Sequence, residues 1–206
     1  LANGESDFTG SPKSRIHNIT VGSQKLNGII IGPNEVFSFN RLLGNIDAST
    51  GFLPELVIKT GVLVAEYGGG LCQVSTTVFR AAMQAGLPIL ERYPHSLPVR
   101  YYNPQGYEAT IYPGVSDLKF KNDTSAHILI QSKIIGSKLY FEVFGTKDGR
   151  QVVIDGPHQY DILSNGALKA ELKRIVTYPD GQEKKDSFKS SYKSPGLFPV
   201  VRNPLE

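Results

Sequence analysis

A run of three glycines followed by Leu71 and Cys72 constrains the fold of this 206-residue chain more than any other feature. Before it, residues 62–66 alternate in a way that predicts a strand. After it, apolar and small side chains recur at spacings of three and four over residues 73–85, which predicts a helix. Glycine permits positive φ angles and a close approach to the backbone. The sequence therefore predicts a tight turn from strand to helix, with Cys72 at the N-terminus of the helix 73–85.

The rest of the pattern indicates an α+β fold, an antiparallel β-rich domain with a few helices. A second helix is predicted over 15–26. Glycine (21 residues) and proline (13 residues) are abundant, which favours many turns. Strands are predicted over 29–31, 35–39, 55–59 (paired with 62–66 around Thr60-Gly61), 89–92, 99–102, 107–112, 118–121, 126–134 and 138–145.

Three segments are expected along the chain. Residues 1–14 are small and polar and predict a loose leader. Residues 15–147 form the main domain. Residues 148–206 form an extension in which 168–178 and 182–192 pair around Asp180-Gly181 as a β-ribbon. Because a lone two-stranded ribbon is marginally stable, we expect it to dock on the main domain or be linked to it.

Charge and hydropathy limit the partners that we expect. The formal net charge is +3, and its surplus lies within 167–195 without the dense basic stripe of a nucleic-acid-binding protein. These bases form either a solvated face or a surface that attracts anionic wall polymers. No run reaches the roughly 18 apolar residues of a membrane span. The chain starts at Leu1, so we expect a processed fragment, and membrane contact only through a segment not present here.

Cys72 is the sole cysteine, so no intramolecular disulfide can form. The free N–H groups and partial positive charge of a helix N-terminus favour an anion, which predicts a lowered thiol pKa and a nucleophilic thiolate. Backbone N–H groups of Leu71 or Gln73 are candidates to hold an oxyanion. The simpler alternative is a buried small hydrophobic residue. A phosphate-binding loop would need a lysine between Gly68 and Thr77, and none is present.

His95 is the candidate base, because it lies in a loop constrained by Pro94 and Pro98. The other histidines, His17, His127 and His158, do not lie in a loop between two prolines, and nothing beside them indicates a catalytic site. A third group that orients the imidazole is not determined: Asp117, Glu108 or a backbone carbonyl could serve, and both carboxylates could equally be surface charges. Candidate substrate-binding residues are Gly68, Gly69, Gly70, Ser96 and Tyr93. With no second cysteine or close histidine pair, we expect no metal and no cofactor.

Several segments together carry a family resemblance. They are EVFSFN (35–40), GGGLCQVSTT (68–77), PHSLPV (94–99), Ala109-Thr110 and DLKFKN (117–122). In order and spacing they resemble VanW-like domains over about residues 15–147. The resemblance implies an extracytoplasmic protein of the bacterial cell envelope, membrane-anchored or secreted, in a family named for its association with glycopeptide (vancomycin) resistance gene clusters.

The resemblance also implies an activity, since members have been assigned L,D-transpeptidase activity, which cross-links peptidoglycan stem peptides through a cysteine. The family's cysteine falls on Cys72 and its histidine on His95. Leu97 stands where the family commonly has arginine, and Glu108 where it commonly has aspartate. Either departure would change specificity if that residue contacts substrate.

The leading hypothesis is therefore a peptidoglycan acyltransferase that forms a Cys72 thioester on stem tetrapeptides and releases D-alanine. If water resolves the thioester, the protein is an L,D-carboxypeptidase instead. The third hypothesis is a non-catalytic cell-wall-binding or scaffold module. Five tyrosines near the predicted site, Tyr93, Tyr101, Tyr102, Tyr107 and Tyr112, would then stack on sugar rings or pack within strands.

Overall fold

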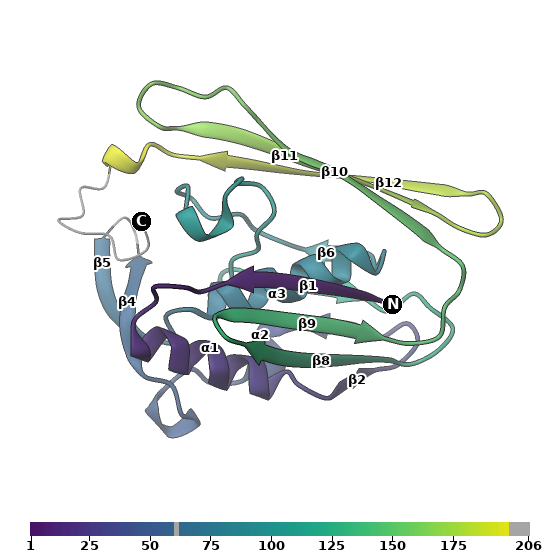
Figure 1. The fold of residues 1–206 in the computed structure, drawn as a ribbon, viewed down its shortest axis with the longest axis horizontal. Coiled ribbons are helices and arrows are strands. Elements are labelled where there is room, and N and C mark those ends of the chain that lie inside the picture. Colours follow the sequence, from purple (N-terminus) through teal and green to yellow (C-terminus); the bar gives the residue numbers. More distant parts are fainter. Residues whose placement is uncertain (60–61, 198–206) are drawn as a thin grey trace.

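The central sheet of the protein has four antiparallel strands in the order β1–β9–β8–β2, as the computed structural model shows (Figure 1). These strands span Ala2–Asp7 (β1), Ile29–Ile31 (β2), Ile128–Ile135 (β8) and Lys138–Phe144 (β9). The structure describes residues 1–59 and 62–197. The predicted α+β class, β-rich with few helices, is confirmed. No helix in the described ranges is long and apolar enough to span a membrane.

Strand β1 replaces the loose leader predicted for residues 1–14, and that prediction is wrong. Its residues pair one by one with β9, from Ala2 with Val143 to Asp7 with Lys138. The strand also lies directly on a helix, α3 (Leu71–Gln84), because a Cβ built on Gly4 would approach the Thr77 carbonyl oxygen to 2.3 Å. A small residue is therefore required where β1 lies against α3.

Two helices pack on the central sheet. Helix α1 (Lys13–Lys25) matches the helix predicted over 15–26. Helix α3 begins two residues earlier than predicted and is followed by Gly86 at φ +70°. Eleven of its residues are buried, so α3 forms the centre of the hydrophobic core.

Shorter elements surround this core. A second antiparallel sheet has the order β3 (Val36–Ser38), β7 (Lys119–Lys121), β6 (Ile89–Glu91), and α2 (Phe39–Leu43) follows β3. Strands β4 (Pro54–Lys59) and β5 (Val62–Tyr67) form the predicted hairpin, whose Thr60-Gly61 turn lies outside the described residues. Short 3₁₀ helices span Ala48–Thr50, Arg100–Tyr102 and Pro195–Leu197.

Two predicted strands between β6 and β7 are absent from the described structure. Residues 100–102 form a 3₁₀ helix, and 107–112 contribute only the single bridges Tyr93–Thr110 and Tyr112–Ser116. Pro98 and Pro104 flank the first segment and lack the amide hydrogens that a strand ladder requires. The chain therefore forms an irregular loop region here, and that region contains His95.

The extension after residue 150 is a ribbon of three strands, one more than predicted. They are β10 (Gln151–Tyr160), β11 (Leu168–Thr177) and β12 (Glu183–Tyr192), in that order (Figure 1). The sequence pattern missed β10 because Gly156-Pro157 interrupts it, and the pairing with β11 is irregular at this point.

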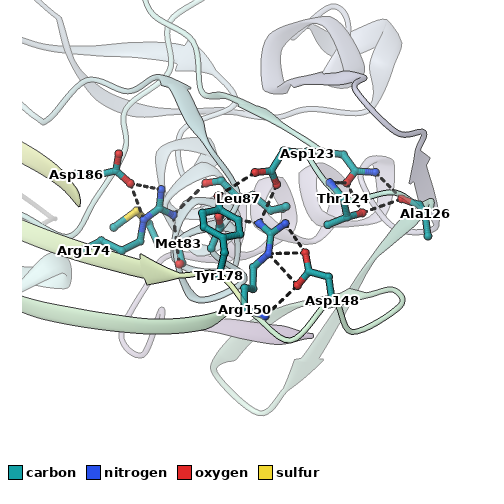
Figure 2. A network of polar contacts seen from close by, with 12 residues as sticks. Met83, Leu87, Asp123, Thr124, Ala126, Asp148, Arg150, Arg174, Tyr178 and Asp186 are labelled. Carbon is teal, nitrogen blue, oxygen red and sulfur yellow. Dashed lines mark hydrogen bonds and ion pairs between the residues drawn. The ribbon is translucent and has the colours of Figure 1, made fainter. Parts of the chain in front are cut away.

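The ribbon packs against the C-terminal end of α3. Leu172 and Val176 are fully buried at this contact. The buried Arg174 donates to the carbonyls of Met83 (3.3 Å) and Leu87 (3.0 Å) and pairs with Asp186, as Figure 2 shows. A cation at a helix C-terminus is favoured by the helix dipole. Hydrophobic burial and charge together therefore join the extension to the main domain.

Candidate functional site

The turn from β5 to α3 has the geometry that the three glycines predicted. Gly68 and Gly70 have φ angles of +83° and +111°, and Gly70 is the residue that caps α3. A Cβ on Gly70 would lie 3.0 Å from Ile19 and 3.1 Å from the Arg15 side chain. From the same helix α1, Asn18 donates to the carbonyl of Gly69 at 3.1 Å. Helix α1 thus fixes the turn that positions Cys72.

Cys72 and His95 line the same cavity, which has a volume of about 720 Å³. The predicted substrate residues Gly68, Gly69, Gly70 and Ser96 line it as well. Tyr93 is not among the lining residues. It is 46% exposed, and its carbonyl accepts a hydrogen bond from the Thr110 amide at 2.8 Å.

The thiol of Cys72 is half-buried and faces a carbonyl. Its Sγ donates to the Ile111 oxygen at 3.7 Å. Burial raises the pKa of the Cys72 thiol, and the positive charge of Arg15 opposes this shift. The sequence predicted a lowered pKa from the helix N-terminus, and that prediction is wrong because desolvation of the buried thiol is the largest effect on its pKa. The thiol is therefore protonated at rest.

The two amides predicted to hold an oxyanion already donate within the chain. The Leu71 amide donates to the Gly68 carbonyl at 3.0 Å, and the Gln73 amide donates to the Gly70 carbonyl at 2.9 Å. The Gln73 side chain is buried and donates to Ser6 at 3.2 Å, away from the cavity. Within the described chain the Cys72 amide has no backbone acceptor. Of these three amides, the Cys72 amide is therefore the one without a backbone acceptor in the described chain.

The His95 imidazole is half-buried and stacked on Tyr102, with ring centroids 4.8 Å apart and planes at 19°. Its Nδ1 is enclosed and has no hydrogen-bond partner among the described residues. Burial lowers the pKa of His95 to about 4, while the charge of Glu108 opposes the shift. The ring is neutral at pH 7 and is able to accept a proton.

The two predicted orienting carboxylates are buried, yet neither hydrogen-bonds to His95 among the described contacts. Asp117 accepts from the Ser38 hydroxyl at 2.6 Å and the Asn40 amide at 2.9 Å, so it stabilises the start of α2. Glu108 accepts from the Gly106 amide at 2.9 Å and from the Tyr192 hydroxyl. Glu108 acts on His95 through its charge only.

Sequence reasoning missed Arg15 and Ile111, which line the cavity, and it named Tyr102 only as a tyrosine that would stack on sugar rings or pack within strands. Tyr102 and Ile111 lie in the irregular region, where periodicity gives no signal. Arg15 had a signal: it lies four residues before Ile19 and therefore shares the buried face of the predicted helix. A charged residue on that face indicates a role beyond packing.

The fold and this cavity define an α+β protein with a cysteine at a glycine-capped helix N-terminus and a neutral histidine in the same cavity. Residues 14–144 match the family described as VanW like protein, and the chain belongs to that family.

Two curated proteins are similar to this chain. The uncharacterized protein YoaR of Bacillus subtilis is 37% identical over 139 residues, which cover 68% of this chain and 46% of YoaR. The vancomycin B-type resistance protein VanW of Enterococcus faecalis is 31% identical over 171 residues, which cover 79% of this chain and 62% of that protein. The chain thus spans less than two thirds of either relative. No solved structure matches it.

Proposed function

We propose that the protein is an acyltransferase of the L,D-transpeptidase type that acts on peptidoglycan stem peptides in the bacterial cell envelope, outside the cytoplasmic membrane. One observation carries the proposal: Cys72 and His95, which lie 23 positions apart in the sequence, line one cavity at the start of α3. The name of the VanW relative, a vancomycin resistance protein, supports a cell-wall substrate.

The protonation states of Cys72 and His95 determine when the proton is transferred in the proposed reaction. Because the thiol is protonated and the imidazole neutral, the proton must leave Sγ as the sulfur attacks the carbonyl that precedes the terminal D-alanine. His95 accepts this proton, the Cys72 amide donates to the developing oxyanion, and a C–S bond forms. The C–N bond then breaks, and the proton passes to the departing amine of D-alanine.

The thioester that remains has two fates. An amine of a second stem peptide resolves it to a cross-link, whereas water resolves it to a shortened peptide, which is the carboxypeptidase outcome. The proposal commits to the cross-link, and product analysis separates the two outcomes.

A second candidate function is a non-catalytic cell-wall-binding module. Two observations favour it: the Cys72 thiol donates to the Ile111 carbonyl, and its pKa is raised. The bases of the ribbon within 167–195 would then attract anionic wall polymers. Among them, Lys169, Lys173 and Lys185 each pair with a nearby carboxylate.

The test is incubation of the protein with tetrapeptide muropeptides, followed by mass spectrometry. We expect dimers, free D-alanine and a covalent adduct on Cys72. Cys72→Ser should abolish the thioester, and His95→Gln should lower turnover by about 10²-fold or more, as expected for loss of a general base.

The matched control is His17→Gln, which changes a histidine whose Nε2 contacts the Gly51 carbonyl outside the cavity. Turnover by this variant should equal that of the wild type. Unchanged product formation by Cys72→Ala would refute the proposal. Binding to peptidoglycan without any turnover would establish the second candidate instead.

A further inference from the structure

Arg15 is a buried cation in the cavity that the reaction above does not use. It begins the buried face of α1, and only 4% of the residue is exposed. It lines the cavity together with Cys72 and His95, and its side chain lies against Gly70, the residue that caps α3. Its positive charge acts on Cys72, His95 and Tyr102.

The guanidinium of Arg15 has few partners in the protein. It donates from Nη1 to the Ser11 hydroxyl at 2.7 Å and stacks over the Tyr101 ring at 4.5 Å. No carboxylate lies within ion-pair distance of it among the described residues. None of its nitrogens is among the enclosed polar atoms that lack a partner, so the nitrogens without a hydrogen bond keep contact with solvent, and the residue lines the cavity.

Two other arginines with little exposed surface are neutralised by carboxylates, whereas the half-buried Arg80 donates to the backbone carbonyls of Tyr107 and Glu5. Arg174 pairs with Asp186, and Arg150 pairs with Asp123 and Asp148 (Figure 2). A buried cation without a counter-ion is costly, because the Coulombic gain that normally offsets desolvation is missing. The lone guanidinium at the cavity therefore indicates an anionic group on the ligand.

We propose that Arg15 binds the terminal carboxylate of the donor peptide and thereby places the preceding carbonyl at Cys72. The inference rests on the proposed function and names the part of the substrate that the cavity recognises. A guanidinium holds a carboxylate through two parallel hydrogen bonds, which fixes orientation as well as position.

The chemistry of the donor fits this arrangement. In a stem peptide that ends in D-alanine, only one nitrogen and one α-carbon separate the attacked carbonyl from the terminal carboxylate. A short spacing of this kind requires the carboxylate-binding group and the nucleophile to share one cavity, as Arg15 and Cys72 do. Only peptides with a free C-terminus would then be donors.

The experiment compares two synthetic stem tetrapeptides, one ending in D-alanine and the other in D-alanine amide. Binding to the Cys72→Ala variant of this chain is measured by calorimetry, so turnover does not enter. We expect the free acid to bind about tenfold or more tightly than the amide, the range for a hydrogen bond to a charged group. Arg15→Gln in the same background should remove this preference.

Two further variants separate recognition from folding and from general charge effects. Arg15→Lys keeps the charge but loses the paired geometry, so a reduced preference is expected. Arg100→Gln removes an exposed cation that does not line the cavity, and the preference should persist. Should Arg15→Gln unfold, the reduced preference of Arg15→Lys in the Cys72→Ala background tests the role of Arg15.

Equal binding of the two peptides to the Cys72→Ala protein, or a preference that survives in Arg15→Gln, would overturn the inference. Failure of the proposed function has another signature. A carboxylate preference that depends on Arg15, in a protein that never forms a Cys72 adduct, would keep the binding site and reject the reaction.

Discussion

At the scale of single residues, burial determines the protonation of the two candidate catalytic groups, Cys72 and His95. It raises the pKa of Cys72 and lowers the pKa of His95 to about 4, so both are neutral at pH 7. Cys72 is therefore not a thiolate at this pH. Under the proposed function, turnover requires a ligand that displaces the Ile111 carbonyl from the thiol and allows the proton to pass to His95.

The lowered pKa of His95 predicts a stability that depends on pH. Below pH 6.5 the unfolded chain binds a proton at this histidine that the folded chain does not bind until about pH 4. Folded-state stability is therefore fully present above pH 6.5, falls as the pH drops from 6.5 to 4, and levels off below 4. The loss should be about 1–3 kcal/mol, since each pKa unit corresponds to about 1.4 kcal/mol.

Urea unfolding of wild type and His95→Gln at pH 7 and pH 4 measures this effect. The wild type should lose more stability than the variant between the two values. His158→Gln is the control, because this ring is exposed and, within residues 1–59 and 62–197, hydrogen-bonds to Asp155. Equal losses in wild type and His95→Gln would contradict the pKa assigned to His95.

At the scale of elements, the junction of α1 with α3 holds the cysteine in place. Gly70, which caps α3, packs directly against α1. It has φ +111° and approaches Ile19 and Arg15 too closely for a side chain. Its backbone conformation is rare for any other residue. The start of α3 therefore depends on α1 as much as on its own sequence.

Gly70→Ala should destabilise the protein by about 2–4 kcal/mol, from left-handed strain and overpacking together. Gly28→Ala is the matched control. Gly28 has φ +81° but nothing within 4 Å of a Cβ, so only strain of about 1 kcal/mol applies. Thermal unfolding compares the two variants, and similar losses would show that the contact with α1 is not tight.

Elements with strong local periodicity could be predicted, and those defined by distant contacts could not. Helices α1 and α3, the β4–β5 hairpin and the β11–β12 ribbon follow from spacing and turn residues. Strand β1 was not predicted, because its inward residues Gly4 and Ser6 are small where they meet α3 and give no apolar alternation. Its partner β9 lies more than 130 residues away.

The candidate site shows the same division. Cys72 and its turn were predictable, because strand, glycines and helix are contiguous in the sequence. The prolines around His95 indicated an exposed loop, but not its stacking on Tyr102 or its lowered pKa. The occupied amides of Leu71 and Gln73 and the position of Arg15 depend on packing between helices, which spacing alone does not encode.

At the scale of the whole molecule, the contacts of the ribbon predict that it unfolds together with the main domain. Beyond the contact of Arg174 with α3, strand β12 reaches the region around His95. The Tyr192 hydroxyl donates to Glu108, and the Lys193 amide donates to the Ser96 carbonyl at 2.8 Å. The loop that bears the candidate base is thus supported from the far end of the described chain.

Leu172→Ala should therefore destabilise the entire protein, by about 2–5 kcal/mol, because this side chain is fully buried between ribbon and α3. Val153→Ala, at a position 60% exposed on β10, should change stability by less than about 0.5 kcal/mol. Urea unfolding followed by far-UV circular dichroism should show one transition in both. A separate early transition in Leu172→Ala would indicate that the ribbon unfolds on its own.

The support from β1 and β12 has a practical consequence for anyone who designs shorter fragments. The family match covers residues 14–144, and an expression boundary drawn there would remove both flanking elements. It would leave the backbone of β9 unpaired along one edge and expose the apolar end of α3 to water. Such a fragment should aggregate, since bare strand edges recruit other chains. The segment that matches the family is therefore shorter than the segment that should fold by itself.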